Sequence, residues 1–497
     1  MQKKYIAFIM SLIMLFLALT SCSANQASKG EDNTTPIETT QPKQTDDTNF
    51  KLSYTQSDSL DPFKAQTQSN QVLSSLVFEG LFDIDERYEI TTDIATGYAY
   101  TDSKTLRVDI NPQLTFSDGS SIDTDDVEFS IKAAMKSPAY KSALTCFSGV
   151  ESKGNSVYIY LKYANPYAVN LLTFPISSIN DDEDGYPIGS GRYSYKTENG
   201  ETVLKANVSE DFDPYITTIK LINIAAADSI DNAVNIGNIS FAFRDMSTDT
   251  AKRISCAKKA VNINNMVYIG INTYAGATAD EKIRQAISLA VDRQTIADSA
   301  YSGYASFASS VFNPYFKATE SVELFSKNSD TATAKQALIQ SGYTNKELTL
   351  TILVSKNENK LAAATLIKNQ LEAAGFNIKI DSVADKEFKR RVKNVEFDLY
   401  IGEVKLGDDM CLYPFFSKDG GVRYGINKKL KTPSLYTSYL NGDEELGKFI
   451  LSFNEEMPFI PLIYKKGMIC YSKAMNGDMQ GYYNNFFTNI DSWNFIS

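Results

Sequence analysis

Residues 348–401, LTLTILVSKNENKLAAATLIKNQLEAAGFNIKIDSVADKEFKRRVKNVEFDLYI, contain the pattern that decides the fold class. Short apolar segments alternate here with longer segments in which apolar residues recur every three or four positions. We predict strands at 348–354, 377–380 and 397–401, and helices at 359–374 and 385–393. Gly375 directly follows the first helix, where a left-handed residue commonly ends one. Strands that alternate with helices are typical of a largely parallel sheet covered by helices, so the stretch predicts an α/β fold.

Further elements are expected on both sides of this stretch. The predicted strands are at 50–54, 106–110, 267–272 and 459–464, and the predicted helices are at 71–81, 334–340 and 446–453, with another that begins at Asp123 or Thr124. Thr278 and Glu281 have the spacing of a capping box and predict a helix start. Asp292 and Arg293 are interpreted as a structural ion pair or a solvated face. Pro461 predicts an edge strand or a strand start, because proline lacks a backbone N–H.

The composition excludes several functional classes. At 497 residues the chain is too long for one core, so two or three domains are expected. The net charge is −11 and there is no long cluster of Lys or Arg, which argues against nucleic-acid binding. The chain has no histidine, which removes the usual general base near neutral pH, His-ligated catalytic zinc and His-activated nucleophiles. We therefore expect no enzyme activity, and the sequence indicates no metal site and no cofactor.

The amino terminus has the organisation of a lipoprotein signal. Lys3 and Lys4 precede an apolar run at 6–19, which is short for a spanning helix but suits a signal-peptide core. The run ends in LTSC at 19–22, which resembles a bacterial lipobox and predicts a signal peptide at 1–21 and lipid on Cys22. The alternative is an ordinary secretory cleavage site with a coincidental cysteine. Residues 22–49 are polar and predict a flexible tether, so the protein would be held at the outer face of the cell membrane by lipid alone.

Four more cysteines are spread through the remaining chain, at Cys146, Cys256, Cys411 and Cys470. They show no CxxC spacing. An even number outside the cytoplasm permits one or two disulfides, but spacing alone pairs none of them. Free buried thiols are the equal alternative.

Several short segments occur in an order that is specific in combination. They are LDP at 60–62, VFEGL at 77–81, LTFSDGSSIDTDDVEF at 114–129, PIGSGRY at 187–193, Asn272, IRQAISLAVDR at 283–293 and EMPFIPL at 456–462. Together they resemble the dipeptide- and oligopeptide-type solute-binding proteins of ABC importers, called family 5. The resemblance implies an extracytoplasmic, lipid-anchored substrate-binding component that captures peptides between two lobes by hinge closure and delivers them to ABC permease subunits in the membrane.

The resemblance also implies an architecture. It is an α/β, two-lobed clamshell of the periplasmic-binding-protein type (type II, cluster C-like) with an inserted subdomain. Lobe I would comprise 50–86, 187–265 and 481–497, the inserted subdomain 87–186, and lobe II 266–480. We expect the protein to act as a monomer.

The ligand-binding segment departs from the family pattern. In relatives, the segment after the strand near Phe397 carries Gly-Trp and then an Asp that pairs with the amino group of a peptide. Here residues 401–409 read IGEVKLGDD, without the Trp and with the acid displaced. A bound peptide needs a carboxylate opposite its ammonium group and a cation opposite its carboxylate. The candidates are Asp408 and Asp409 for the first role, Lys405 and Arg423 for the second, and Tyr413, Tyr424 and Phe82 as aromatic contacts.

Other ligands and other classes of protein stay open at this point. An oligosaccharide or a metal chelate is the alternative ligand of the same fold; the lack of histidine disfavours a His-anchored metal complex, while an aromatic content of 12% suits a sugar. A lipid-anchored glycoside hydrolase would need two carboxylates about 5–10 Å apart in a cleft. A structural surface lipoprotein or signalling co-receptor is the third class.

Overall fold

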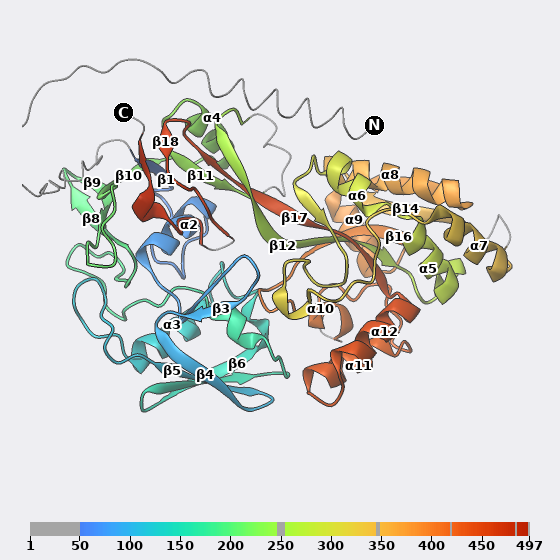
Figure 1. Ribbon diagram of the computed structural model, residues 1–497, viewed down its shortest axis with the longest axis horizontal. Helices are drawn as coiled ribbons and strands as arrows, with labels where there is room; N and C mark the ends of the chain where they lie inside the picture. The colour runs from blue at the N-terminus through green and yellow to red at the C-terminus, as the bar shows by residue number, and fades with distance from the viewer. Residues whose placement is uncertain (1–49, 246–253, 344–347, 418–419, 483–484, 496–497) are drawn as a thin grey trace, which may run out of the picture. The chain divides into compact units, whose positions relative to one another are not determined.

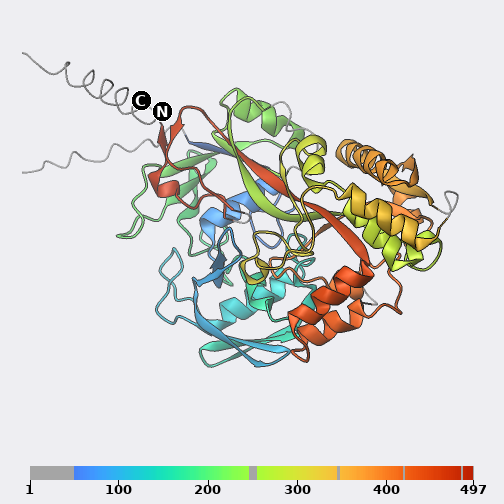
Figure 2. The same ribbon diagram turned by 45° about the vertical axis from the view of Figure 1, so that its right-hand side comes forward.

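Two long strands, β12 (Ala257–Ile271) and β17 (Phe459–Tyr471), organise the computed structural model of the protein (Figure 1). The structure describes residues 50–245, 254–343, 348–417, 420–482 and 485–495, which belong to the compact unit Gln44–Ser497. The two strands form an antiparallel pair and run side by side in both views (Figure 1, Figure 2). The predicted signal peptide at 1–21, Cys22 and the tether at 22–49 lie outside the described residues.

The main sheet extends from both sides of this pair. Its order is β15-β14-β16-β12-β17-β11-β1-β10-β9-β8, and β13 also pairs with β17. The other strands are β16 (Leu399–Lys405), β14 (Thr349–Ser355), β15 (Asn377–Val383), β13 (Ala305–Phe307), β11 (Phe241–Arg244), β1 (Lys51–Tyr54), β10 (Thr218–Asn223), β9 (Glu201–Ala206) and β8 (Tyr193–Glu198). Within this mixed sheet, β14 runs parallel to β15 and β16, and β1 runs parallel to β10 and β11. The predicted parallel α/β layer is therefore present.

Helices accompany the β12 side of the sheet. They are α5 (Glu281–Ala290), α6 (Arg293–Thr295), α7 (Thr331–Ser341), α8 (Glu358–Ala374), α9 (Asp385–Lys393), α10 (Tyr413–Phe416), α11 (Thr432–Leu440) and α12 (Leu446–Glu456). The sequence sets their ends locally. The side chain of Asn357 accepts a hydrogen bond from the Lys360 N–H at the start of α8, and Gly375 ends that helix with a φ of 114°. The predicted stop at Gly375 is confirmed.

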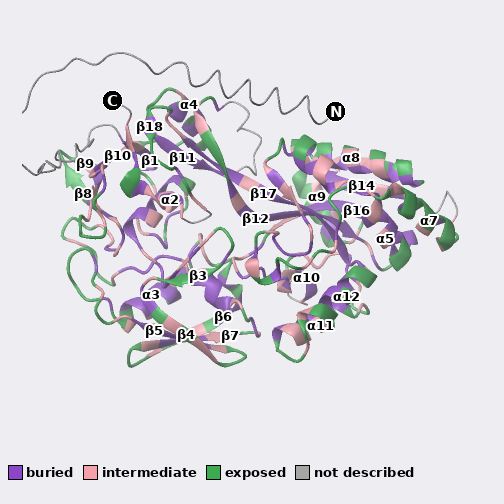
Figure 3. Cartoon of the chain, in the orientation of Figure 1, coloured by how far each residue is buried: buried purple, intermediate pink, exposed green. Residues whose placement is uncertain are grey.

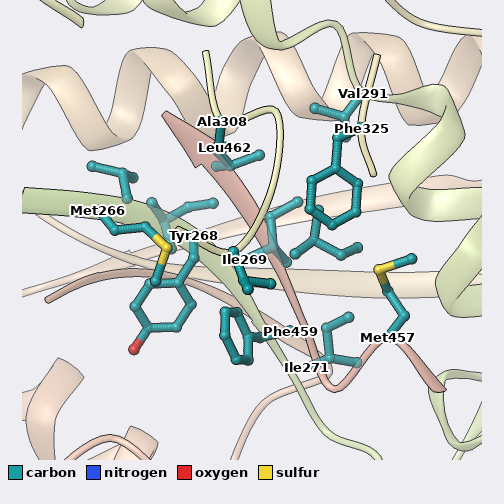
Figure 4. Packing of buried hydrophobic residues seen from close by; sticks show 14 of the residues in the cluster. Met266, Tyr268, Ile269, Ile271, Val291, Ala308, Phe325, Met457, Phe459 and Leu462 are labelled. Atoms are coloured by element: carbon teal, nitrogen blue, oxygen red, sulfur yellow. The ribbon is translucent and has the colours of Figure 1, made fainter. Parts of the chain in front are cut away.

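The core beside these helices is built on β12 and β17. Met266, Tyr268, Ile269 and Ile271 of β12 pack with Phe459 and Leu462 of β17 and with side chains from the surrounding helices and loops (Figure 4). Both strands are buried along most of their length, whereas α7 and α8 also carry exposed residues (Figure 3). Burial of apolar area, at about 25 cal/mol per Å², is the main stabilising term for this pairing.

Three further cores lie elsewhere in the described chain, the smallest of them around α4 and β11. A separate sheet, β4-β5-β7-β6, packs with α3 around its own apolar cluster; its elements are β4 (Ala95–Asp102), β5 (Thr105–Ile110), β7 (Ser156–Leu161), β6 (Phe147–Lys153) and α3 (Thr124–Ala134). Asp123 caps α3, as predicted, in a capping box with Asp126. Another cluster surrounds β1 and β8 to β11 and includes the fully buried Trp493. The remaining elements are α2 (Gln68–Val77), β2 (Phe82–Ile84), β3 (Ile90–Thr92), α4 (Ile230–Asn235), β18 (Met475–Asn476) and β19 (Asn494–Phe495).

Two helix starts differ from the sequence predictions. The helix predicted at 71–81 is α2, which begins at Gln68 and ends at Val77, because Phe78 is already extended. The capping box predicted from Thr278 and Glu281 is wrong. Asp280 caps α5 by accepting from the Lys282 N–H, while the Thr278 hydroxyl donates to the carbonyl of Asn272.

The interpretation of Asp292 and Arg293 as an ion pair or solvated face is also wrong. Asp292 caps α6 by accepting from the Thr295 N–H. Arg293 is only 2% exposed, donates to the carbonyl oxygens of Pro461 and Ser288, and lies 4.6 Å from the centre of the Phe325 ring. Burial lowers the pKa of its guanidinium to about 9.

Pro461 lies near the start of β17, as expected, but β17 is an inner strand of the sheet. The edge-strand alternative is therefore wrong. A register shift between Val267 and Tyr268 of β12 lies beside Pro461, and such an irregularity accommodates a residue that cannot donate to the ladder.

The predicted lobe and subdomain boundaries remain a prediction. β12 crosses the boundary placed between residues 265 and 266, so the two predicted lobes share this strand. Among the described residues, no helix combines the length and apolar character that a membrane span requires.

Two tyrosines of the central strands occupy space that only glycine leaves open. Tyr268 lies directly across from Gly402, and Tyr400 directly across from Gly270. A Cβ on Gly270 would lie 1.9 Å from a ring carbon of Tyr400, and one on Gly402 would lie 2.4 Å from the Tyr268 ring. The two phenol hydroxyls are 3.1 Å apart, so both rings are held over the glycines.

We expect Gly270→Ala to lower the free energy of unfolding by at least about 2 kcal/mol, because the buried ring of Tyr400 must leave its position. Urea unfolding of the purified protein measures the change. Gly149→Ala is the control, since no atom lies within 4 Å of the added Cβ. Equal stability of the two variants would show that the Tyr–Gly pairing is not required.

Candidate functional site

A cavity of about 610 Å³ lies among segments that are distant in sequence. This volume is typical of sites that hold small-molecule ligands. The cavity is lined by residues of α2 and of the segment that follows it, by residues from 91–93, 139–145, 171–175 and 191–192, by Lys405 at the end of β16, and by residues of the loop that follows β16.

The loop after β16 has the form of a tight turn. Its first residue, Leu406, donates its N–H to the carbonyl of Asn264 in β12 at 3.0 Å. The Met410 N–H then donates to the carbonyl of Gly407 at 3.0 Å, with Met410 at a φ of 50°. A Cβ on Gly407 would lie 2.5 Å from the carboxylate of Asp409, so this approach requires glycine. The turn projects Asp408 and Asp409 from the end of the strand.

Asp409 is buried and both of its carboxylate oxygens accept hydrogen bonds. Oδ2 accepts from the Asn165 side chain at 2.7 Å, and Oδ1 accepts from the Cys411 N–H at 3.2 Å. Burial raises the pKa of the carboxyl to about 6, against the effect of these hydrogen bonds. Asp409 thus joins the loop to the segment before α10 and to residue 165.

Asp408 is less buried than Asp409 and is connected to β12. Its Oδ1 accepts from the Asn264 side chain at 2.8 Å. Asn264 in turn accepts from the Tyr88 hydroxyl at 2.5 Å and from the Asn313 amide at 3.0 Å. Burial raises the pKa of Asp408 to about 7, with Lys405 lowering it and Asp409 raising it. The position of Asp408 is therefore coupled to the middle of β12.

The structure brings four of the predicted site residues together around the cavity. They are Lys405, Asp408, Asp409 and Phe82. Lys405 is exposed at the end of β16, and Phe82 is buried with its ring edge-to-face against Tyr98.

The other three candidates are placed differently. Tyr413 stacks on Tyr163, with 3.6 Å between ring centres, and Tyr163 lines the cavity. Arg423 and Tyr424 precede Gly425, whose carbonyl accepts from the Thr273 hydroxyl. Neither is among the described residues that line the cavity.

Three carboxyl groups and one guanidinium in the cavity wall were not predicted. Glu79 follows α2, Asp83 is in β2, Asp93 follows β3, and Arg192 precedes β8. Burial raises the pKa of all three acids; that of Asp93 rises to about 7, with the charges of Glu79 and Asp83 adding to the effect. Arg192 donates to two backbone carbonyls of the segment 487–488.

The sequence contained a partial signal for two of these residues. Glu79 belongs to VFEGL at 77–81 and Arg192 to PIGSGRY at 187–193, two of the segments that carry the family resemblance. Asp83 and Asp93 belong to no motif, so only the fold brings them to the cavity. Within the described ranges, no group of three or more His, Cys, Asp or Glu side chains is arranged to hold a metal ion.

Comparison with known proteins identifies the family of this chain. The family described as "Bacterial extracellular solute-binding proteins, family 5 Middle" matches residues 89–421. The chain belongs to this family. The prediction from the ordered sequence segments is confirmed.

Individual family 5 relatives show the range of named ligands. The chain is 24% identical over 70% of its length to the nickel-binding protein NikA of Staphylococcus aureus, covering 73% of that protein. It is 23% identical over 82% of its length to the oligopeptide-binding protein AppA of Bacillus subtilis, covering 84% of it. The solved structure of AppA in complex with a nonapeptide matches 90% of this chain and 99% of AppA, with a TM-score of 0.56 and 20% identity.

A second solved structure has a closer fold. The ABC transporter substrate-binding protein CtaP of Listeria monocytogenes matches 90% of this chain and 99% of its own, with a TM-score of 0.67 and 19% identity. These structures confirm the predicted two-lobed, periplasmic-binding-protein type of α/β fold. This family 5 protein is the solute-binding component of an ABC importer, and it is not an enzyme.

The raised pKa of Asp93 predicts a pH-dependent stability of the ligand-free protein. Its carboxyl holds a proton more tightly in the folded chain than in the unfolded one. The free energy of unfolding therefore falls as the pH rises from about 4 through about 7. Asp93→Asn removes the titrating carboxyl, and with it this fall in the free energy of unfolding. We expect the variant to match the unsubstituted protein near pH 4 and to exceed its free energy of unfolding by about 1–3 kcal/mol at pH 8.

Unfolding curves across pH measure this difference. The control is Asp211→Asn at an exposed aspartate. A difference between Asp93→Asn and the unsubstituted protein that does not change with pH would contradict the prediction.

Proposed function

We propose that this family 5 protein captures peptides in the cavity beside Asp408. The observation that supports the proposal is the presence of both charges around one cavity of about 610 Å³, with a lysine at the end of β16 and two acidic groups on the loop that follows it. A peptide has an ammonium group at one end and a carboxylate at the other, and both lose water when they bind. The similarity to AppA, an oligopeptide-binding protein, supports the same ligand class.

Asp408 is the proposed partner of the peptide amino group. Asp409 has both oxygens in hydrogen bonds within the protein, whereas the less buried Asp408 borders the cavity. An ammonium group beside Asp408 would favour its ionised form and so offset the cost of its burial. We assign Asp409 a positioning role, because it holds the loop against Asn165.

The balance of charge in the cavity favours ligands with additional positive groups. The charged side chains in its described lining are Glu79, Asp83, Asp93, Asp408 and Asp409 on one hand, and Arg192 and Lys405 on the other. Arg192 already donates to backbone carbonyls. We propose Lys405 as the partner of the peptide carboxylate, and the Asp93 side of the cavity as the place for a basic side chain.

We further propose the cellular arrangement that the sequence predicted. Lipid on Cys22 and a tether at 22–49 would hold a monomeric binding protein at the outer face of the membrane beside its permease. Hinge closure between lobe I (50–86, 187–265 and 481–497) and lobe II (266–480) would enclose the ligand, with 87–186 as the inserted subdomain.

A thermal-shift screen against pooled peptides, oligosaccharides and metal chelates tests the ligand class. A peptide at a hundred times its dissociation constant should add about 2.7 kcal/mol of stability. Calorimetry with the peptide found should then show binding about 10- to 100-fold weaker for Asp408→Asn, because a charge-assisted hydrogen bond is lost.

Two comparisons make this test specific. Acetylation of the peptide amino group should weaken binding to the unsubstituted protein by a similar factor and have little further effect on Asp408→Asn. Asp443→Asn, at an exposed position, should bind normally. A sugar or chelate hit without a peptide hit would overturn the peptide proposal, and no hit in any pool would count against all three ligand classes.

The anchor has its own test. In bacteria fed a labelled fatty acid, the unsubstituted protein should carry the label and remain with the membrane fraction, since two or more acyl chains hold a protein stably. Cys22→Ala should lose the label. An unlabelled protein released to the medium would show that residues 1–22 form an ordinary secretory signal.

A further inference from the structure

The ends of β12 and β17 bring two cysteines together outside the lining of the ligand cavity. Cys256 directly precedes β12, and Cys470 is the last but one residue of β17. Lys258 lies directly across from Cys470 in this antiparallel pair. Residues 256 and 258 face the same side of an extended chain, so Cys256 lies diagonally opposite Cys470.

The two thiols are in contact within one apolar cluster. Cys470 is fully buried in a cluster formed with α4 and β11, and Cys256 packs against the same cluster. The thiols share a hydrogen bond with each other. Of the four cysteines in the described chain, Cys256 alone is partly exposed, and all four are free thiols in this structure.

We propose that Cys256 and Cys470 are joined by a disulfide in the protein after export. Family 5 is a family of extracellular proteins, and disulfides form and persist in that environment. The bond would fasten the start of β12 to the end of β17 and close a loop of more than two hundred residues. This is the strand pair that both sides of the main sheet depend on.

The chemistry needs an external oxidant, and an exported thiol–disulfide oxidoreductase or glutathione disulfide supplies it. The Cys256 thiolate attacks one sulfur of the oxidant disulfide and releases the other as a thiol. The Cys470 sulfur, on losing its proton, then attacks the mixed disulfide and displaces the second oxidant thiol. One S–S bond forms in the protein, one breaks in the oxidant, and two electrons and two protons pass to the oxidant.

Cys256 is suited to be the attacking group. The hydrogen bond from Cys470 lowers the pKa of its thiol, Lys258 also lowers it, and its exposure admits an oxidant. Cys146 and Cys411 differ in both respects. They are buried, and burial raises the pKa of each, that of Cys411 to about 12. The structure therefore favours one specific crosslink at Cys256 and Cys470.

Peptide mapping of the full chain tests the proposal. The protein is incubated with glutathione disulfide, its free thiols are alkylated without reductant, and the digest is analysed by mass spectrometry. We expect one crosslinked peptide pair containing residues 256 and 470. Reduction should release both thiols and lower the Tm by about 5 °C, because the closed loop is long. Alkylation of both residues before reduction, or a crosslink from Cys256 to another cysteine, would overturn the proposal.

Two variants separate this bond from a general effect of reductant. Cys256→Ser keeps the size of a partly exposed side chain and should abolish both the crosslinked peptide and the reductant-dependent shift in Tm. Cys146→Ala removes a buried thiol outside the pair and should retain both. Loss of the shift in Cys146→Ala but not in Cys256→Ser would refute the assignment.

Discussion

The antiparallel pairing of β12 with β17 is the constraint on which the rest of the structure depends. β16 takes its register from β12, so the loop that carries Asp408 leaves the sheet at a point set by this pairing. The ladder between β12 and β17 is irregular between Asn262 and Met266. Within that stretch the Asn264 carbonyl accepts from the Leu406 N–H, while the Asn264 side chain donates to Asp408. Asn264 therefore connects the irregular stretch of β12 to the loop that carries Asp408.

A partly buried charge network fastens the same region. Glu403 of β16 pairs with Lys465 of β17 at 3.2 Å and with Lys360 of α8 at 2.9 Å, and it accepts from the Asn265 side chain. Burial would raise the pKa of Glu403, but the two lysines and the hydrogen bonds outweigh it and hold the pKa at about 2. Removing Glu403 would leave the buried Lys465 without this carboxylate, which costs several kcal/mol. The network therefore connects the strand before the ligand loop to both β17 and a helix of the layer.

Local sequence patterns predicted helices, strands and helix ends. They did not predict contacts between residues that are distant in sequence. The alternation at 348–401, the cap at Asp123 and the stop at Gly375 are local, and the structure contains them. The T-x-x-E pattern at 278–281 failed because Asp280 lies closer to the helix and caps it. Arg293 was misjudged because its carbonyl partner on β17 is distant in sequence. Asp83 and Asp93 could not be predicted as cavity residues, since only tertiary packing places them beside Glu79.

The electrostatics of the cavity connect ligand capture to stability. Asp93, Asp408 and Asp409 have pKa values raised to about 6 or 7, which means that the empty protein resists their ionisation. A cation that enters the cavity favours the ionised forms and offsets part of this cost, so it lowers the pKa of these carboxyls and releases protons from them. Asp408 also accepts from Asn264 in the irregular part of β12, so the proposed partner of the ligand is connected to the strand shared by the two predicted lobes.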